Sequence, residues 1–110
     1  MKSVQTLKWW LAGIVFIVIG IPPIFEKIPP NPWYGFRVAK TFSDERIWYA
    51  ANRVMGYDML IAGLVILIGA IVVAKFIRGN PRLANRICFS VFLFSLVTAL
   101  AHGFWALSRM

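Results

Sequence analysis

The sequence predicts an all-α membrane protein: three transmembrane helices, with an amphipathic, proline-rich connector between the first and the second. Of the 110 residues, 60% are apolar and only 15% are charged, and the mean hydropathy is +0.73. Soluble domains usually carry about 25% charged residues. The apolar residues fall in three long runs, and about 20 such residues in a helix cross a bilayer. These observations exclude a soluble enzyme domain, a disulfide-stapled secreted miniprotein and a disordered tail.

The first predicted span covers residues 7–25, in which Lys8 is the only charged residue. Its long side chain can reach the lipid head groups, and the adjacent tryptophans suit the membrane interface. A secretory signal peptide is the alternative interpretation. No small-residue cleavage site follows, however, and Pro22-Pro23 lies where one would be. We therefore expect a retained helix that ends near these prolines.

The predicted connector covers residues 26–56. Five of the six prolines lie between Pro22 and Pro32, and proline favours an extended, stiff chain. A helix is then expected to begin near Thr41 or Ser43, either of which can act as its N-cap. Because this helix runs into the second apolar run, it exceeds one bilayer thickness. Its first turns must either protrude or bend at Gly56 to lie along the surface.

The second and third predicted spans, about 57–77 and 86–107, form an antiparallel hairpin. Gly79 and Asn80 are expected to cap the second span, and Pro81 is expected to stop it.

Small residues recur every seven positions along the second span, at Gly56, Gly63 and Ala70. Such a seam lets another helix approach closely. It is a candidate surface for oligomer formation.

The net charge of +8 arises from basic residues that flank the apolar runs. This placement suits membrane lipids as partners and argues against nucleic acid. With three spans, each side of the membrane carries six Lys and Arg. The short turn around Arg78–Arg86 has no acidic residue, whereas all four acids lie on the other side. The positive-inside rule then predicts a cytoplasmic N-terminus and an outside connector.

Metal, cofactor and catalytic sites are not expected. Cys88 is the only cysteine and His102 the only histidine, so no disulfide and no zinc cluster can form within the chain. No nucleophile–base spacing appears.

One stretch carries a recognisable pattern. From Pro30 to Gly56 the sequence contains Asn31, then Gly35-Phe36-Arg37, then Thr41-Phe42-Ser43-Asp44-Glu45, then Trp48 and Asn52. This pattern resembles the SdpI family of small bacterial membrane proteins. The resemblance implies a cell-membrane protein of immunity type. The family's named member protects its producer from a secreted peptide toxin and can hold a repressor at the membrane.

The motif residues form a candidate binding cluster. On a helix, Glu45, Trp48 and Asn52 share one face. Arg37 is expected within ion-pairing reach of Glu45. The alternative is that this pair only fastens the connector to the helix, with Trp48 packed beneath.

Asp58 and His102 lie 23 and 21 residues from Pro81, so the hairpin places them at similar depth. Ionisable residues inside a membrane are functional candidates. We predict a shallow polar cavity lined by Glu45, Asn52, Asp58 and His102 that receives a peptide or a lipid head group. The alternative is that Asp58 lies at the interface and His102 bonds a backbone carbonyl. The candidate binding residues are Asn31, Gly35, Arg37, Thr41, Glu45, Trp48, Asn52, Asp58 and His102.

The leading functional hypothesis is a non-enzymatic membrane protein that binds a peptide or protein partner at the connector side, in toxin immunity or signalling. A small oligomeric transporter is an alternative, which would need a membrane-embedded carboxylate such as Asp58. An accessory subunit of a larger membrane complex is another, and its sign would be the small-residue seam buried against a different chain.

Overall fold

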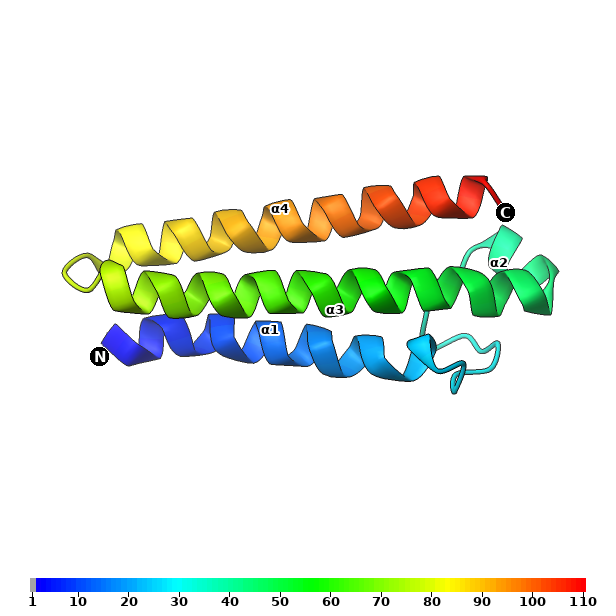
Figure 1. Cartoon of the computed structure of the whole chain (residues 1–110), viewed down its shortest axis with the longest axis horizontal. Coiled ribbons are helices and arrows are strands. Elements are labelled where there is room, and N and C mark those ends of the chain that lie inside the picture. The colour runs from blue at the N-terminus through cyan, green and yellow to red at the C-terminus, as the bar shows by residue number, and fades with distance from the viewer. Residues whose placement is uncertain (1) are drawn as a thin grey trace.

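The computed structural model describes residues 2–110, with side chains from Leu7 onward. Its elements are α1 (Lys2–Ile24), α2 (Ala39–Ser43), α3 (Glu45–Phe76) and α4 (Pro81–Ser108). The three long helices lie side by side in a rod of 52 × 23 × 18 Å, with α3 in the middle (Figure 1). All three are long and apolar enough to cross a membrane. The predicted all-α fold with three candidate transmembrane helices is confirmed.

Helices α1 and α3 touch backbone to backbone at two glycine pairs. A Cβ atom on Gly63 would lie 2.6 Å from the carbonyl oxygen of Gly13, and one on Gly20 would lie 2.5 Å from that of Gly56. Such distances allow only hydrogen on both sides, and they favour weak Cα–H···O contacts between the helices. Gly13 and Gly20 of α1 are spaced by seven residues, as are Gly56 and Gly63 of α3, and this matching spacing is a sequence signal for the contact.

The small-residue seam of α3 is therefore filled within the chain. Gly56 and Gly63 face α1, and Ala70 is 1% exposed in a cluster with Val73, Ala84 and Cys88. The close helix approach occurs as expected, but its partner is α1 rather than a second copy. Oligomerisation stays a prediction, and it would have to use another surface.

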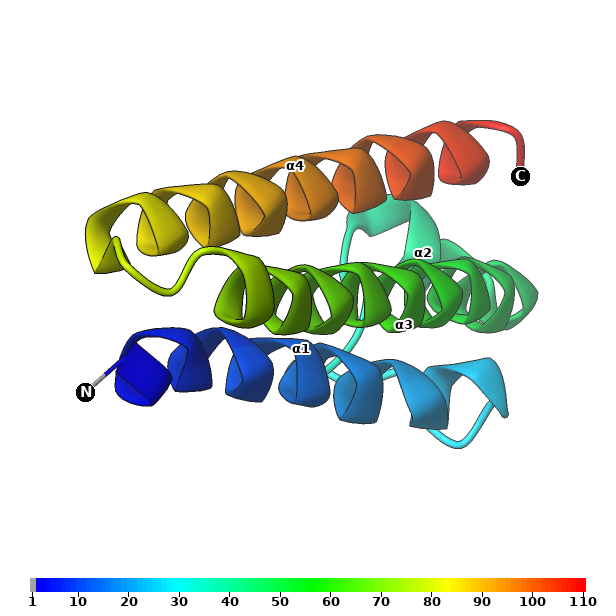
Figure 2. The ribbon, with the colours of Figure 1, turned by 60° about the vertical axis from the view of Figure 1, so that its left-hand side comes forward.

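Helix α1 also contacts α4, near the turn between α3 and α4. The indole Nε1 of Trp9 donates a hydrogen bond of 3.1 Å to Oδ1 of Asn85, and its ring packs 5.6 Å from that of Phe92. At the opposite end, α2 and the connector lie beside α3 (Figure 2). The connector is thus confined to the end of the rod far from the N-terminus.

The prolines end α1 as expected, but from inside its last turn. Pro22 and Pro23 belong to the helix, and the amides of Phe25 and Lys27 both bond the carbonyl of Pro22. Glu26 then adopts φ 57°, which reverses the chain into the connector.

Helix α3 is continuous for 32 residues and does not bend at Gly56. At 1.5 Å per residue it is about 48 Å long, against about 30 Å for the hydrocarbon layer. Of the two expected alternatives, the continuous helix argues against the bend at Gly56 and favours a helix whose first turns protrude. Contact with α1 at Gly56 explains this, because the packed glycine is held in regular helical geometry.

The predicted N-caps of this helix are wrong. Thr41 and Ser43 lie in the short helix α2, and the cap of α3 is Asp44, whose Oδ1 accepts the amide of Arg46 at 2.7 Å. An extended residue at Asp44 separates the two helices.

The predicted role of the turn residues is also wrong. Asn80 caps α4 by accepting the amide of Leu83 at 3.0 Å, and Pro81 is the first helical residue. Proline suits the first position of a helix because that position needs no amide donor. Helix α4 thus begins five residues before the predicted third span, and Ile77 caps the end of α3.

Candidate functional site

Trp48 anchors the connector to α3. Its side chain is 0% exposed, and its Nε1 donates a hydrogen bond of 2.8 Å to the carbonyl of Ile28. The ring of Phe42 packs 5.2 Å away. Trp48 projects from the first turns of α3, so the indole fastens the proline-rich segment to the helix.

Asn52, one turn further along α3, holds the next part of the connector. It is 1% exposed, its Oδ1 accepts the amide of Phe36 at 2.6 Å, and its Nδ2 donates to the carbonyl of Trp48 at 2.8 Å. Gly35 lies directly against it with φ +111°, and a Cβ there would be 2.4 Å from Oδ1 of Asn52. The loop can approach the buried amide only because residue 35 is glycine.

Asn31 shapes the loop itself. Its Oδ1 accepts the amides of Trp33 and Tyr34, and its Nδ2 donates to the carbonyl of Pro29 at 2.7 Å. The Tyr34 hydroxyl then donates to the carbonyl of Ile19 in α1. Burial raises the pKa of Tyr34, which keeps this hydroxyl protonated as a donor.

Thr41 and Lys40 attach α2. The hydroxyl of Thr41, which is 0% exposed, donates to the carbonyl of Val38 and accepts its amide, so it closes the start of α2. Lys40 Nζ donates to the carbonyl of Leu107 at 2.7 Å, at the C-terminal end of α4, where a cation is favoured. The connector therefore contacts all three long helices.

The predicted Arg37–Glu45 ion pair is wrong. Arg37 Nη1 donates to the carbonyl of Pro32 at 2.6 Å, inside its own loop, and Glu45 is exposed at the start of α3. The ion pair that ties the connector to α3 is Arg53 Nη2 to Glu26 Oε1, at 2.5 Å. Helix α2 lies between Arg37 and Glu45 in the chain. The Arg37 guanidinium bonds the carbonyl of Pro32 in its own loop instead of Glu45.

Most motif residues thus serve the fold of the connector. The structure brings Gly35, Trp48 and Asn52 together beneath it, and their polar groups bond main-chain atoms. This arrangement supports the interpretation that the motif fastens the connector, whereas a direct binding role for its residues stays a prediction.

Asp58 and His102 form a second cluster, between α3 and α4. His102 Nδ1 lies 2.8 Å and 2.9 Å from the two carboxylate oxygens of Asp58, as their similar depth suggested. Because a carboxylate accepts hydrogen bonds, Nδ1 carries the hydrogen of this contact. The Asp58 side chain is 13% exposed and that of His102 is 51% exposed. The carboxylate on α3 is therefore largely buried, whereas the imidazole on α4 is half exposed.

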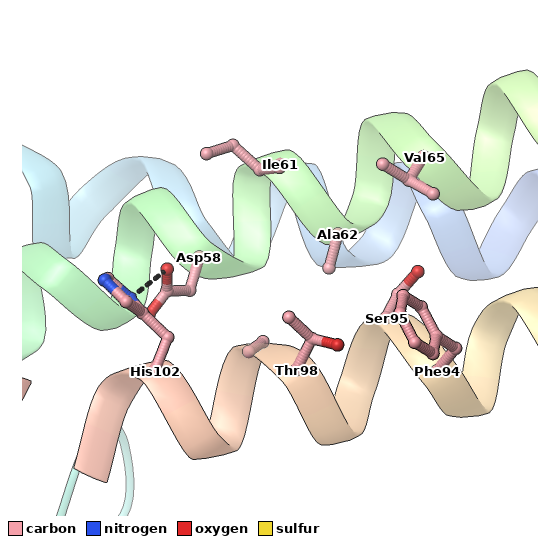
Figure 3. A pocket seen from close by; sticks show the side chains of 9 residues that line it. Asp58, Ile61, Ala62, Val65, Phe94, Ser95, Thr98 and His102 are labelled. Carbon is pink, nitrogen blue, oxygen red and sulfur yellow. Dashed lines mark hydrogen bonds and ion pairs between the residues drawn. The ribbon is translucent and has the colours of Figure 1, made fainter. Parts of the chain in front are cut away.

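This pair closes one end of a groove of about 390 Å³ (Figure 3). The groove is lined by Asp58, Ile61, Ala62, Val65, Phe94, Ser95, Thr98, Ala99 and His102. Its lining is mostly apolar, and the hydroxyls of Ser95 and Thr98 add the remaining polar groups. The spacing of Ser95, Thr98 and His102 by three and four residues was a readable signal that the sequence analysis missed.

The composition of the predicted polar cavity is wrong in two members. Asn52 is buried under the connector and Glu45 lies exposed beyond it, so neither lines the groove. A helix turns about 100° per residue, which places Asn52 about 120° around α3 from Asp58. Asp58 and His102 remain as the polar end of an apolar groove.

The SdpI/YfhL protein family matches residues 27–108, which include the connector, α3 and α4. The protein named "Uncharacterized protein YfhL" of Bacillus subtilis (strain 168) is 37% identical over 59 residues. That match covers 51% of this chain and 52% of YfhL, so it spans about half the length of this curated relative. No solved structure matches the chain.

Proposed function

The chain belongs to the SdpI/YfhL family and is an integral membrane protein of SdpI type, and from this we propose that it is a non-enzymatic protein that binds a peptide or protein partner at its connector side. Toxin immunity is the role that the family suggests first, and signalling is the second. The observation that carries the proposal is the groove between α3 and α4, which ends at Asp58 and His102.

The lining of this groove favours a membrane-inserted segment over a soluble metabolite. Ala62 and Ala99 leave room for a close neighbour, while Ile61, Val65 and Phe94 offer apolar surface. Dispersion contacts with such a surface favour a segment that is itself apolar.

The experiment on partner binding uses a photo-crosslinking amino acid at Phe94, which borders the groove, in cells that naturally express the chain. A crosslinked polypeptide is expected at this position. The control position is Val18 on the exposed face of α1, where no polypeptide adduct is expected. Ala62→Phe, which fills the groove, should abolish the Phe94 adduct. Identical adducts at both positions would refute partner binding in the groove. The identified polypeptide, added to cells with and without the chain, then tests immunity by growth.

The proposed location is the bacterial cell membrane, with a cytoplasmic N-terminus. The end of the rod that holds the turn carries exposed Lys75, Arg78, Arg82 and Arg86, and the positive-inside rule favours this end in the cytoplasm.

Cysteine labelling tests this orientation. In a Cys88→Ser background, Trp33→Cys is expected to react with a membrane-impermeant maleimide in intact cells, and Gly79→Cys only after permeabilisation. Both sites are suitable because Trp33 is 82% exposed and a Cβ on Gly79 meets nothing within 4 Å. Labelling of position 79 alone in intact cells would reverse the proposed topology.

A small oligomeric transporter is the second candidate. It is favoured by the ionisable Asp58–His102 pair within the helical hairpin. Asp58→Asn would then stop transport while leaving the Phe94 adduct intact. An accessory subunit of a larger complex was expected to bury the small-residue seam against a different chain. The seam is instead buried against α1 of the same chain, so this observation does not favour that alternative.

A further inference from the structure

We propose that the Asp58–His102 pair recognises a cation, the ammonium of a lysine side chain, on an apolar peptide helix that lies in the α3–α4 groove. This inference rests on the proposed function, and it names the chemistry of the partner.

The ionic contacts of the four acidic residues suggest that Asp58 can accept a further cation. Glu26 pairs with Arg53, Asp44 lies 4.0 Å from Arg46, and Glu45 is exposed at the protruding end of α3. Asp58 differs from them, because its ionic contact in the described part of the chain is with His102 alone.

A neutral imidazole supplies a hydrogen bond but no compensating charge. A carboxylate in an apolar, membrane-facing groove is costly unless a cation or water compensates it. The nearest basic residue in sequence to His102, Arg109, is engaged elsewhere, with its guanidinium 5.3 Å from the ring centre of Trp105. With the imidazole neutral, the charge on Asp58 is available to a cation from outside the chain.

The geometry leaves an approach for that cation. The Nδ1 side of His102 faces Asp58, while the other ring nitrogen points away from the carboxylate (Figure 3). The imidazole is stacked on Trp105 with centroids 6.0 Å apart, which fixes the plane of the ring. A lysine ammonium that enters from the groove can reach a carboxylate oxygen of Asp58, because each oxygen keeps a lone pair that the imidazole does not use.

The depth of the pair fits a lysine near the end of a membrane helix. Asp58 precedes Lys75 by 17 residues, or about 26 Å along α3. With Lys75 at one head-group level, Asp58 lies just inside the opposite edge of a hydrocarbon layer of about 30 Å. Lysines of transmembrane peptides extend toward that level. From Asp58 to Val65 the groove follows α3 for two turns, enough for the apolar side chains of a docked helix.

The test uses the purified full-length chain in phosphatidylcholine nanodiscs, with ¹⁵N-labelled histidine. His102 is the only histidine, so its ring gives one set of NMR signals. The probe is a synthetic leucine–alanine helix with one lysine near its end, and the matched probe has norleucine at that position. The lysine peptide is expected to shift the His102 ring signals and to bind at least tenfold more tightly than the norleucine peptide. Asp58→Asn should remove this difference. Glu26→Gln, which neutralises a carboxylate outside the groove, should preserve it.

Several results would overturn the inference. Equal binding of the two peptides would show that the pair does not recognise the lysine cation. The Phe94 adduct, and with it the proposed function, would be unaffected by that result. Failure of both peptides to bind would show that an apolar helix does not dock in the groove. A His102 ring protonated on both nitrogens at neutral pH without peptide would show that the pair is already neutral. The same signal shift caused by phosphatidylethanolamine alone would make the occupant a lipid. If Asp58→Asn does not fold, the comparison of the two peptides on the unmodified chain still decides.

Discussion

Gly63→Ala is expected to destabilise the helical rod by about 2–3 kcal/mol, the upper part of the range for overpacked interiors. The added Cβ would lie 2.6 Å from the carbonyl oxygen of Gly13 and 2.9 Å from the amide nitrogen of Ile17. Both obstacles are backbone atoms, which cannot rotate away as a side chain does, so α1 must move off α3. Unfolding in mixed micelles by titration with sodium dodecyl sulfate, followed by far-ultraviolet circular dichroism, measures the loss.

Gly69→Ala is the matched control on the same helix. A Cβ at Gly69 would meet only the side chain of Val91, at an ordinary distance of 3.4 Å. Because alanine favours a helix by up to about 1 kcal/mol over glycine, this variant should unfold at the same or a slightly higher denaturant concentration than the unmodified chain. Equal losses at positions 63 and 69 would show that the loss at position 63 does not arise from contact with the backbone of α1.

Asn52→Leu is expected to cost about 2 kcal/mol and to loosen the connector. The leucine is similar in size but leaves the amide of Phe36 without its 2.6 Å acceptor, and a buried unpaired amide costs about 1–3 kcal/mol. Hydrogen exchange followed by mass spectrometry should show faster exchange over residues 33–37, with α1 and α4 still protected. Unchanged exchange in this segment would contradict the role given to Asn52.

Gly35 provides the coupled variant. Gly35→Ala places a Cβ 2.4 Å from Asn52 Oδ1 and also forces alanine into φ +111°. Truncation of the neighbour by Asn52→Ala removes the first of these costs but not the second. Gly35→Ala should therefore be less destabilising in the Asn52→Ala background than alone. Additive losses would show that the two residues do not meet.

The sequence predicted those parts of the structure that follow from periodicity. Three apolar runs predicted the long helices, and counting back from the turn at Pro81 placed Asp58 opposite His102. The spacing of four between Trp48 and Asn52 placed both on the face of α3 that the connector covers.

Other parts depended on information that periodicity does not carry. The path of the connector is fixed by the turn at Asn31 and the left-handed residue Gly35, so the partner of Arg37 could not be derived from its distance in sequence to Glu45. Asn80-Pro81 is chemically suited both to end one helix and to begin the next. The prediction that Asn52 lines the cavity with Asp58 was wrong for a simpler reason. The rotation of about 100° per residue in a helix already places the two residues on different faces of α3.

The way in which the connector is held has a consequence for how such proteins diversify. Trp48 and Asn52 bond main-chain atoms at Ile28 and Phe36, and these atoms are present with any amino acid at position 28 and with any except proline at position 36. Outward side chains such as Trp33, 82% exposed, take no part in these bonds. Mutation can therefore change what the outer surface presents while the framework beneath keeps its shape.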